Sequence, residues 1–213
     1  MSVSMTDPVL AEAVGPSEGM ALRIKQVILV VAGITLLSIA AQIKVMVPPS
    51  PVPVNLGTFA VLTIGAAYGP RLGIATILGY MLIGALGFDI FASSTAELNG
   101  VNYMFGSTGG YLFGYVLATL ALGLMARRGW DRSVVLMAVA MLVGNIILYV
   151  PGLAWLSHWI GASGKLDVAQ YGSLWDQTFA WGITPYLIGD AMKLALAALL
   201  LPAIWKLVGK ARA

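Results

Sequence analysis

Two ionisable residues stand inside the last strongly apolar stretch of the chain, PYLIGDAMKLALAALLLPAIW, residues 185–205. Asp190 and Lys193 are three positions apart, near the start of this stretch. In a helix this spacing places both side chains on one face, where they can interact. A charged side chain within a membrane span is costly unless it is paired or hydrated, so such residues face the protein interior and mark functional sites.

Two interpretations of the pair remain open. Asp190 and Lys193 can form an internal ion pair that only fixes helix packing. Alternatively, Lys193 presents a cation to a buried anion while Asp190 holds the lysine in position and keeps it protonated. The position near one end of the span favours access from one face of the membrane, which suits a bound carboxylate.

Other polar residues are candidate neighbours of this pair. Asn145 and Tyr149 are four positions apart, so they share a helix face, and an amide and a phenol can hydrogen-bond a small polar head group. Tyr80 and Tyr111, which lie in two further apolar segments, are also candidates to hydrogen-bond such a head group. For all four residues, a polar contact between helices is the alternative.

The loop DIFASSTAELNGVNYMFGST, residues 89–108, and its flanks are rich in aromatic residues. Phe88, Phe91, Tyr103 and Phe105 can form an apolar lid over a binding site. A loop that is simply packed on a helix bundle would need the same residues, so both interpretations stand.

The elements that position these residues must be membrane helices. Hydrophobic residues make up 59% of the 213 residues and charged residues only 10%, whereas about a quarter of the residues in a soluble domain are charged. Spans of about 20 apolar residues consume most of this length. We therefore expect one integral membrane domain. The net charge of +3 comes from basic residues at the ends of apolar runs, which argues against nucleic acid as a partner.

The sequence predicts an all-α membrane protein with six transmembrane helices. Their expected ranges are 22–46, 56–68, 72–88, 109–126, 133–156 and 183–206. Residues 22–213 would form this single six-helix domain, and residues 1–21 a flexible cytoplasmic tail. Between the first two segments, VPPSPVPVNLG (47–57) has too many prolines for a helix and should be an extended connection that folds back over the bundle.

The distribution of basic residues predicts the orientation. With six spans, most lysines and arginines fall on one side, which the positive-inside rule makes cytoplasmic. Those residues are Arg23, Lys25, Arg71, Arg127, Arg128, Arg132, Lys206, Lys210 and Arg212. Both termini are then expected in the cytoplasm, and the two longest loops outside.

Enzyme chemistry has little support in the sequence. His158 is the one histidine and there is no cysteine, so a metal site built from several histidines or thiolates is excluded. No GxSxG, HExxH or P-loop motif is present. We expect no cofactor, and any energy for transport must come from another protein.

Six short motifs in this order resemble the BioY family, the biotin-binding S components of energy-coupling factor (ECF) vitamin transporters. The resemblance runs from about Leu22 to the C-terminus. The motifs are VPVNLGT (52–58), YGPRLG (68–73), GALG (84–87), GSTGGY (106–111), YVPGLAWL (149–156) and GDAMK (189–193).

The resemblance implies a six-helix bundle of the ECF S-component type in a bacterial cytoplasmic membrane. It implies that biotin is captured at the outer face, with Asp190 and Lys193 at the biotin carboxylate. It also implies two kinds of partner, a transmembrane coupling protein (T component) and ABC-type ATPases. The full set of candidate substrate-binding residues is Asp190, Lys193, Asn145, Tyr149, Tyr111, Phe91, Asn55 and Tyr80.

The chain departs from the family pattern in places. No arginine occurs from 72 to 126, where family members often carry one in the outer loop. Asn55 stands where threonine is usual, and the first span lacks the AxxxA spacing associated with coupling. The alternatives are an S component for another anionic vitamin, a small proton-coupled carrier that uses Asp190, and a membrane enzyme that uses Lys193.

Overall fold

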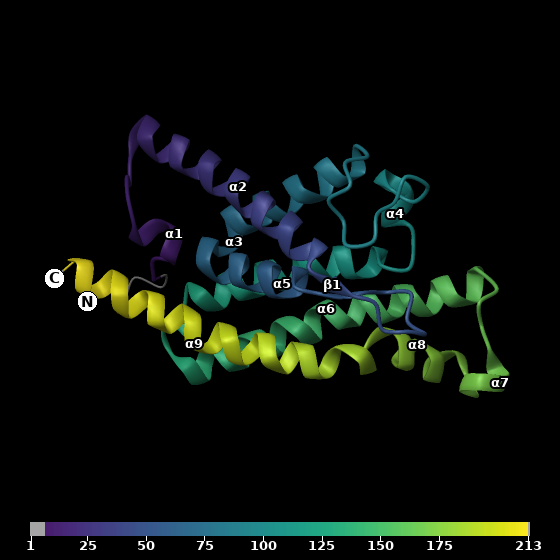
Figure 1. The fold of residues 1–213 in the computed structure, drawn as a ribbon. Coiled ribbons are helices and arrows are strands. Elements are labelled where there is room, and N and C mark those ends of the chain that lie inside the picture. The colour runs from purple at the N-terminus through teal and green to yellow at the C-terminus, as the bar shows by residue number, and fades with distance from the viewer. Residues whose placement is uncertain (1–6, 213) are drawn as a thin grey trace.

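The computed structural model describes residues 7–212 and is almost entirely helical. Five long helices run along one axis, and short helices and a two-stranded ribbon lie between them (Figure 1). In chain order the elements are α1 (Leu10–Ala13), α2 (Gly19–Gln42), β1 (Lys44–Val45), β2 (Val54–Asn55), α3 (Gly57–Ala85), α4 (Gly100–Met104), α5 (Gly109–Ala126), η1 (Trp130–Arg132), α6 (Val134–Ala162), α7 (Val168–Tyr171), α8 (Leu174–Gly182), η2 (Thr184–Tyr186) and α9 (Leu187–Arg212).

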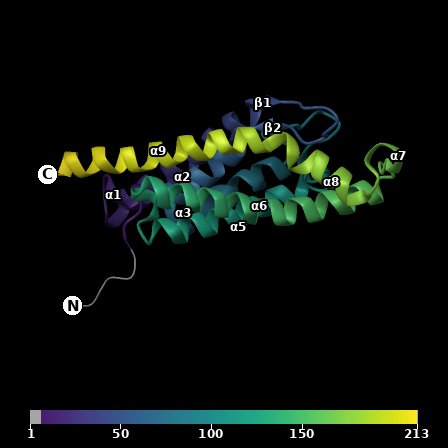
Figure 2. The same ribbon diagram turned by 90° about the horizontal axis from the view of Figure 1, so that it is seen from below.

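The bundle has two distinct ends. Short helix α1 and the C-terminal end of α9 lie at one end, whereas α4 and α7 lie at the other (Figure 1). A view turned by 90° again separates α1 from α7 along the long axis (Figure 2). The two long loops predicted to share one side of the membrane therefore lie at the same end of the molecule.

Helix α3 reverses direction at its middle. Gly69 has a φ of 75°, which favours glycine, and Pro70 follows it as the first residue of the second half. A Cβ placed on Gly73 would lie 3.5 Å from the Cα of Gly65. In one continuous helix these residues would be roughly 12 Å apart along the axis. Residues 57–68 and 70–85 are therefore two helical segments that lie against each other.

The predicted segments correspond closely to these helices. Five helical stretches of the described chain are long and apolar enough to cross a membrane when α3 is counted as one. The two halves of α3 are the predicted second and third segments, and the predicted 109–126 segment coincides with α5. The count of six spans and the cytoplasmic termini stay predictions.

Glycines on α5 let its neighbours approach at backbone distance. A Cβ on Gly110 would lie 2.3 Å from the Pro151 carbonyl oxygen, and one on Gly114 would lie 2.7 Å from the Leu148 carbonyl oxygen, both on α6. Gly110 and Gly114 form a GxxxG pair, the spacing typical of close membrane helices. On another face of α5, Gly123 contacts the backbone of the α3 reversal at Pro70.

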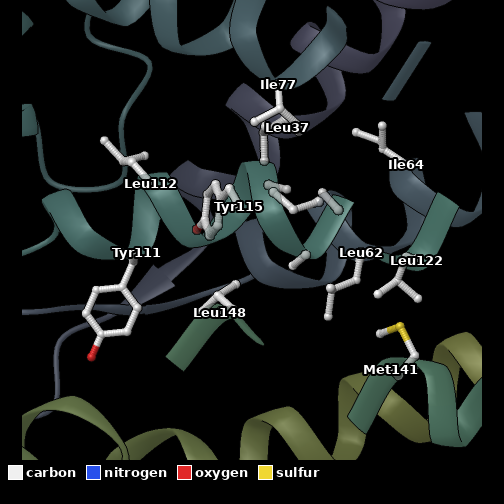
Figure 3. Packing of buried hydrophobic residues seen from close by; sticks show 14 of the residues in the cluster. Leu37, Leu62, Ile64, Ile77, Tyr111, Leu112, Tyr115, Leu122, Met141 and Leu148 are labelled. Atoms are coloured by element: carbon white, nitrogen blue, oxygen red, sulfur yellow. The ribbon is translucent and has the colours of Figure 1, made fainter. Parts of the chain in front are cut away.

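The buried core lies between α2, α3, α5 and α6. Its labelled members include Leu37, Leu62, Ile77, Leu122 and Met141, all at most 1% exposed (Figure 3). Towards the end that carries α4, the buried residues of α5 become aromatic and polar. A site for a polar ligand is therefore expected there rather than at the bundle centre.

The proline-rich connection between the first two segments folds back over the bundle, as expected. Strands β1 and β2 pair antiparallel, with Lys44 opposite Asn55. We call residues 46–53 between them the strap. The Ser50 hydroxyl donates to the Trp181 carbonyl at 2.6 Å, and the Tyr186 hydroxyl donates to the Val52 carbonyl. These bonds attach the strap to the segment that leads into α9.

The N-terminal segment differs from the expected flexible tail. Residues 1–6 lie outside the described part of the chain, but Val9 is fully buried, against the space left by Gly69. The Arg127 guanidinium pairs with the Glu12 carboxylate, and the Asp7 amide donates to the Arg127 carbonyl at 2.8 Å. Residues 7–13 are therefore attached to the bundle, and α2 already begins at Gly19.

Candidate binding site

Asp190 and Lys193 form a buried ion pair at the start of α9. Asp190 is 7% exposed and Lys193 is 8% exposed, and the Lys193 Nζ lies 3.0 Å from the Asp190 Oδ1. The short η2 turn, which begins with Thr184-Pro185, leads directly into α9 and sets where its first turn begins. The pair is neutral as a whole, which is how two charges are retained in an apolar bundle.

Each member of the pair also has a partner on another helix. Lys193 Nζ donates to the Thr58 hydroxyl on α3 at 2.9 Å. The Tyr149 hydroxyl on α6 donates to Asp190 Oδ2. The site therefore joins α3, α6 and α9 through side chains that are far apart in the sequence.

The pair lies in the wall of a cavity of about 50 Å³, enclosed by α3, α5, α6, α9, the strap and the outer loop that precedes α4. That volume is enough for several water molecules. Its lining residues are Ala41, Val52, Pro53, Asn55, Thr58, Tyr80, Phe91, Ala92, Tyr103, Thr108, Tyr111, Leu112, Tyr115, Leu148, Tyr149, Tyr186, Asp190 and Lys193. Seven of the eight predicted site residues are therefore brought together.

Asn145 is the predicted residue that does not line this cavity. It is buried on α6, one helical turn before Tyr149. One turn is about 5.4 Å along the axis, which moves Asn145 towards the bundle centre although it shares a face with Tyr149.

The outer loop contributes Phe91 to the cavity. Phe91 is 1% exposed, stacks on Tyr103 with ring centroids 4.7 Å apart, and meets the Tyr80 ring edge-on at 5.4 Å. Phe88 and Phe105 are 60% and 66% exposed, so only two of the four loop aromatics expected in a lid are buried there.

Tyrosines form the wall opposite the loop. Tyr111 and Tyr115 project from α5, and the Tyr111 hydroxyl points away from the aliphatic core (Figure 3). That hydroxyl donates to the Gly182 carbonyl at 2.8 Å. The Tyr149 ring lies between those of Tyr111 and Tyr186, at centroid distances of 6.3 and 6.5 Å. Aromatic faces suit the apolar parts of a ligand, and the phenol groups its polar atoms.

Sequence reasoning missed Thr58, Tyr115 and Tyr186 in the cavity wall, and Ser50, which attaches the strap. Tyr115 follows Tyr111 by four positions, so their shared face was a usable signal. Thr58, Ser50 and Tyr186 gave no such signal, because threonine, serine and tyrosine are common in membrane helices and loops and the contacts join distant parts of the chain.

The geometry suits a small anion with an apolar body. Lys193 offers the cation, Asp190 balances it, and the remaining wall is mostly aromatic and aliphatic, as in typical small-molecule sites. Within residues 7–212 no group of three histidine or acidic side chains could hold a metal ion.

Comparisons with known proteins agree along almost the whole chain. The model of the BioY family matches residues 13–210. A "Probable biotin transporter BioY" of Pyrococcus horikoshii is 32% identical over 179 residues, which are 84% of this chain and 95% of that protein. The "Biotin transporter BioY" of Thermotoga maritima is 29% identical over 172 residues, which are 81% of this chain and 92% of that protein.

A solved structure has a similar fold. It is the crystal structure of the S-component for biotin from an ECF-type ABC transporter, with a TM-score of 0.68 over 89% of this chain and 95% of that chain. The two sequences are 16% identical, so the likeness describes the arrangement of the helices.

Proposed function

The chain belongs to the BioY family, and on that premise we propose that it captures biotin for uptake across a bacterial cytoplasmic membrane. In this proposal it is the substrate-specific S component of an ECF-type transporter. The observation that carries the proposal is the buried Asp190–Lys193 pair in the wall of an aromatic cavity.

The proposed binding mode starts from the hydrogen bonds of Lys193. An ammonium group has three N–H donors, and Asp190 and Thr58 accept two of them. The third is available for a biotin carboxylate oxygen. Asp190 holds the lysine in position, and Tyr149 donates a hydrogen bond to Asp190 that would stabilise it when a second carboxylate arrives nearby.

For biotin to bind, the cavity must widen beyond the room for several water molecules that it has here, and the apolar chain and ring system would then lie along the same wall. Tyr80, Tyr111 and Phe91 offer aromatic surfaces, and Asn55 offers an amide at the end of β2. An amide and phenols can hydrogen-bond a ureido group. We do not assign Asn145 to the ligand, because it is not in the cavity wall.

We further propose that residues 57–68 and 70–85 each cross the membrane, which gives six spans and cytoplasmic termini. Arg71 and Arg127 lie together at the end of the bundle that holds α1, as the positive-inside rule requires of a cytoplasmic end. The binding cavity then opens near the outer face.

Energy for uptake would come from partners. The sequence has no P-loop motif, so the proposed partners are a transmembrane T component and two ATPases. The substrate-binding chain would supply recognition, and the partners the conformational work.

The ligand is tested by equilibrium titration of the purified chain with biotin, thiamine and riboflavin in detergent. Biotin is expected to bind with an affinity far above those of the other two vitamins. Preference for another vitamin would show an S component of different specificity, and no binding to any of the three would contradict a capture role.

A further inference from the structure

A second, larger cavity lies at the opposite end of the bundle from the ligand site. It has a volume of about 500 Å³ and is bounded by the N-terminal segment, α2, the reversal of α3 and the end of α5. We call it the basal groove. Its lining residues are Ala11, Glu12, Ser17, Leu22, Lys25, Gln26, Leu29, Tyr68, Arg71, Leu72, Ala75 and Arg127.

Two helix faces build the basal groove. On α2 it is lined at positions 22, 25, 26 and 29, and on α3 at positions 68, 71, 72 and 75. Both sets follow the i, i+3, i+4, i+7 spacing of one helix face. On each helix the lining residue furthest from the bundle end is apolar: Leu29 follows Lys25 and Gln26, and Ala75 follows Arg71, although the apolar Leu22 precedes Lys25 on α2. The groove is therefore charged at its mouth and apolar along its length.

The charge at the mouth is positive. Lys25, Arg71 and Arg127 face one acidic residue, Glu12. Glu12 is already paired with Arg127, and Lys25 donates to the Val14 carbonyl at 2.9 Å. Arg71 is exposed and has no hydrogen-bond or ion-pair partner within residues 7–212. The groove thus has cationic donors in excess of its own acceptors.

We propose that the basal groove binds an anionic phospholipid, with the phosphate at Lys25 and Arg71 and one acyl chain along Leu29, Leu72 and Ala75. A phosphodiester is a strong acceptor for arginine and lysine donors. Basic pockets between membrane helices at the cytoplasmic surface suit such head groups. The apolar floor favours a lipid over free phosphate, which would need no such floor.

The test is native mass spectrometry of the full chain released from detergent micelles, titrated with dioleoyl-phosphatidylglycerol or dioleoyl-phosphatidylcholine. The parent chain is expected to bind the first phosphatidylglycerol molecule several times more tightly than the first phosphatidylcholine. Lys25→Gln and Arg71→Gln should each weaken phosphatidylglycerol binding roughly fivefold, since one basic residue near a membrane surface contributes about that much.

Arg128→Gln is the matched control, because Arg128 is an exposed arginine next to Arg127 that does not line the groove. It should leave phosphatidylglycerol binding unchanged. Equal binding of the two lipids by the parent chain would contradict the proposed site. So would a loss of phosphatidylglycerol affinity in Arg128→Gln as large as the loss in Arg71→Gln. Displacement of phosphatidylglycerol by inorganic phosphate at similar concentration would identify a site for free phosphate and would contradict the proposal that the ligand is a lipid. Retained biotin binding by Arg71→Gln would show that the variant is folded.

Discussion

Lys193 is a buried cation that depends on neutral as well as charged neighbours. One of its three N–H donors is accepted by Asp190 on the same helix and another by Thr58 on a distant one. A hydrogen bond to a charged group contributes more to stability than one between neutral groups, so the Thr58 hydroxyl should matter although it is a small side chain.

Thr58→Val removes this hydroxyl with little change in shape. We expect a loss of roughly 1–3 kcal/mol in stability, because the buried ammonium loses an acceptor. Thermal unfolding in detergent measures the effect. Thr63→Val is the control, since the Thr63 hydroxyl bonds only to carbonyls of its own helix, at Phe59 and Ala60. Equal effects of the two variants would mean that the Lys193 contact adds nothing.

Residue types alone were enough to find the ion pair but not its full environment. Charges are conspicuous in an apolar segment, so Asp190 and Lys193 stood out. Asn145 shared a helix face with Tyr149, but periodicity does not say how far along the axis a cavity extends. Thr58 could not be found, because its contact depends on how α3 packs against α9.

At the scale of elements, α5 is held by close backbone contacts as well as by its buried side chains. Gly114 faces the backbone of Leu148 on α6, with no room for a methyl group. Because lipid chains are as apolar as the helix surfaces, such close approach is a main source of association between membrane helices.

Gly114→Ala should therefore destabilise the bundle, by roughly 1–3 kcal/mol, as overpacking does elsewhere. Gly161→Ala, near the end of α6, is the matched change, because a Cβ there meets nothing within 4 Å. That variant should be neutral or slightly stabilising, since alanine is the better helix former. Thermal unfolding of both variants in detergent measures the change in stability. A Gly114→Ala protein as stable as the parent would contradict the role of close backbone packing.

The strap closes one side of the cavity through few bonds. Ser50→Ala removes the bond to the Trp181 carbonyl, and we expect biotin to dissociate severalfold faster, since one such bond contributes about 1 kcal/mol. Stopped-flow displacement measures this rate. Ser38→Ala should not change it, because the Ser38 hydroxyl bonds only within α2. An unchanged rate in Ser50→Ala would show that the strap does not limit release.

Element boundaries were predictable where apolar runs end in Gly, Pro or charged residues. The 109–126 segment and the reversal at Gly69-Pro70 are examples. The sequence could not show which loop aromatics turn inward. The buried ring of Phe91 packs on Tyr80 and Tyr103, and the Gln42 amide at the end of α2 donates to the Phe91 carbonyl at 2.9 Å. These contacts join distant parts of the chain.

For the whole molecule, the fold places the candidate binding cavity at one end and a group of basic residues at the other. The N-terminal segment belongs to the basic end, where Val9 fills the space at Gly69 and Glu12 pairs with Arg127. The sequence predicted a flexible tail for this segment. Only the assembled bundle brings Arg127 to the partner that attaches this segment.

The proposed topology can be tested with single cysteines, because the natural chain has none. Glu97→Cys in the outer loop and Arg128→Cys between α5 and α6 both replace exposed residues. A membrane-impermeant maleimide should label the first in intact spheroplasts and the second only after permeabilisation. Labelling of both from outside, or the reverse pattern, would contradict six spans with cytoplasmic termini.

Binding of the biotin carboxylate by Lys193 is tested most directly by one calorimetric comparison. Biotin and uncharged biotin amide are titrated into the parent chain and into a variant with Asp190→Asn and Lys193→Met, which removes the cation without leaving a lone buried charge. We predict that biotin loses roughly tenfold to hundredfold in affinity through the lost charged hydrogen bond, whereas biotin amide loses far less. Equal losses for the two ligands would show that the pair only holds the helices together.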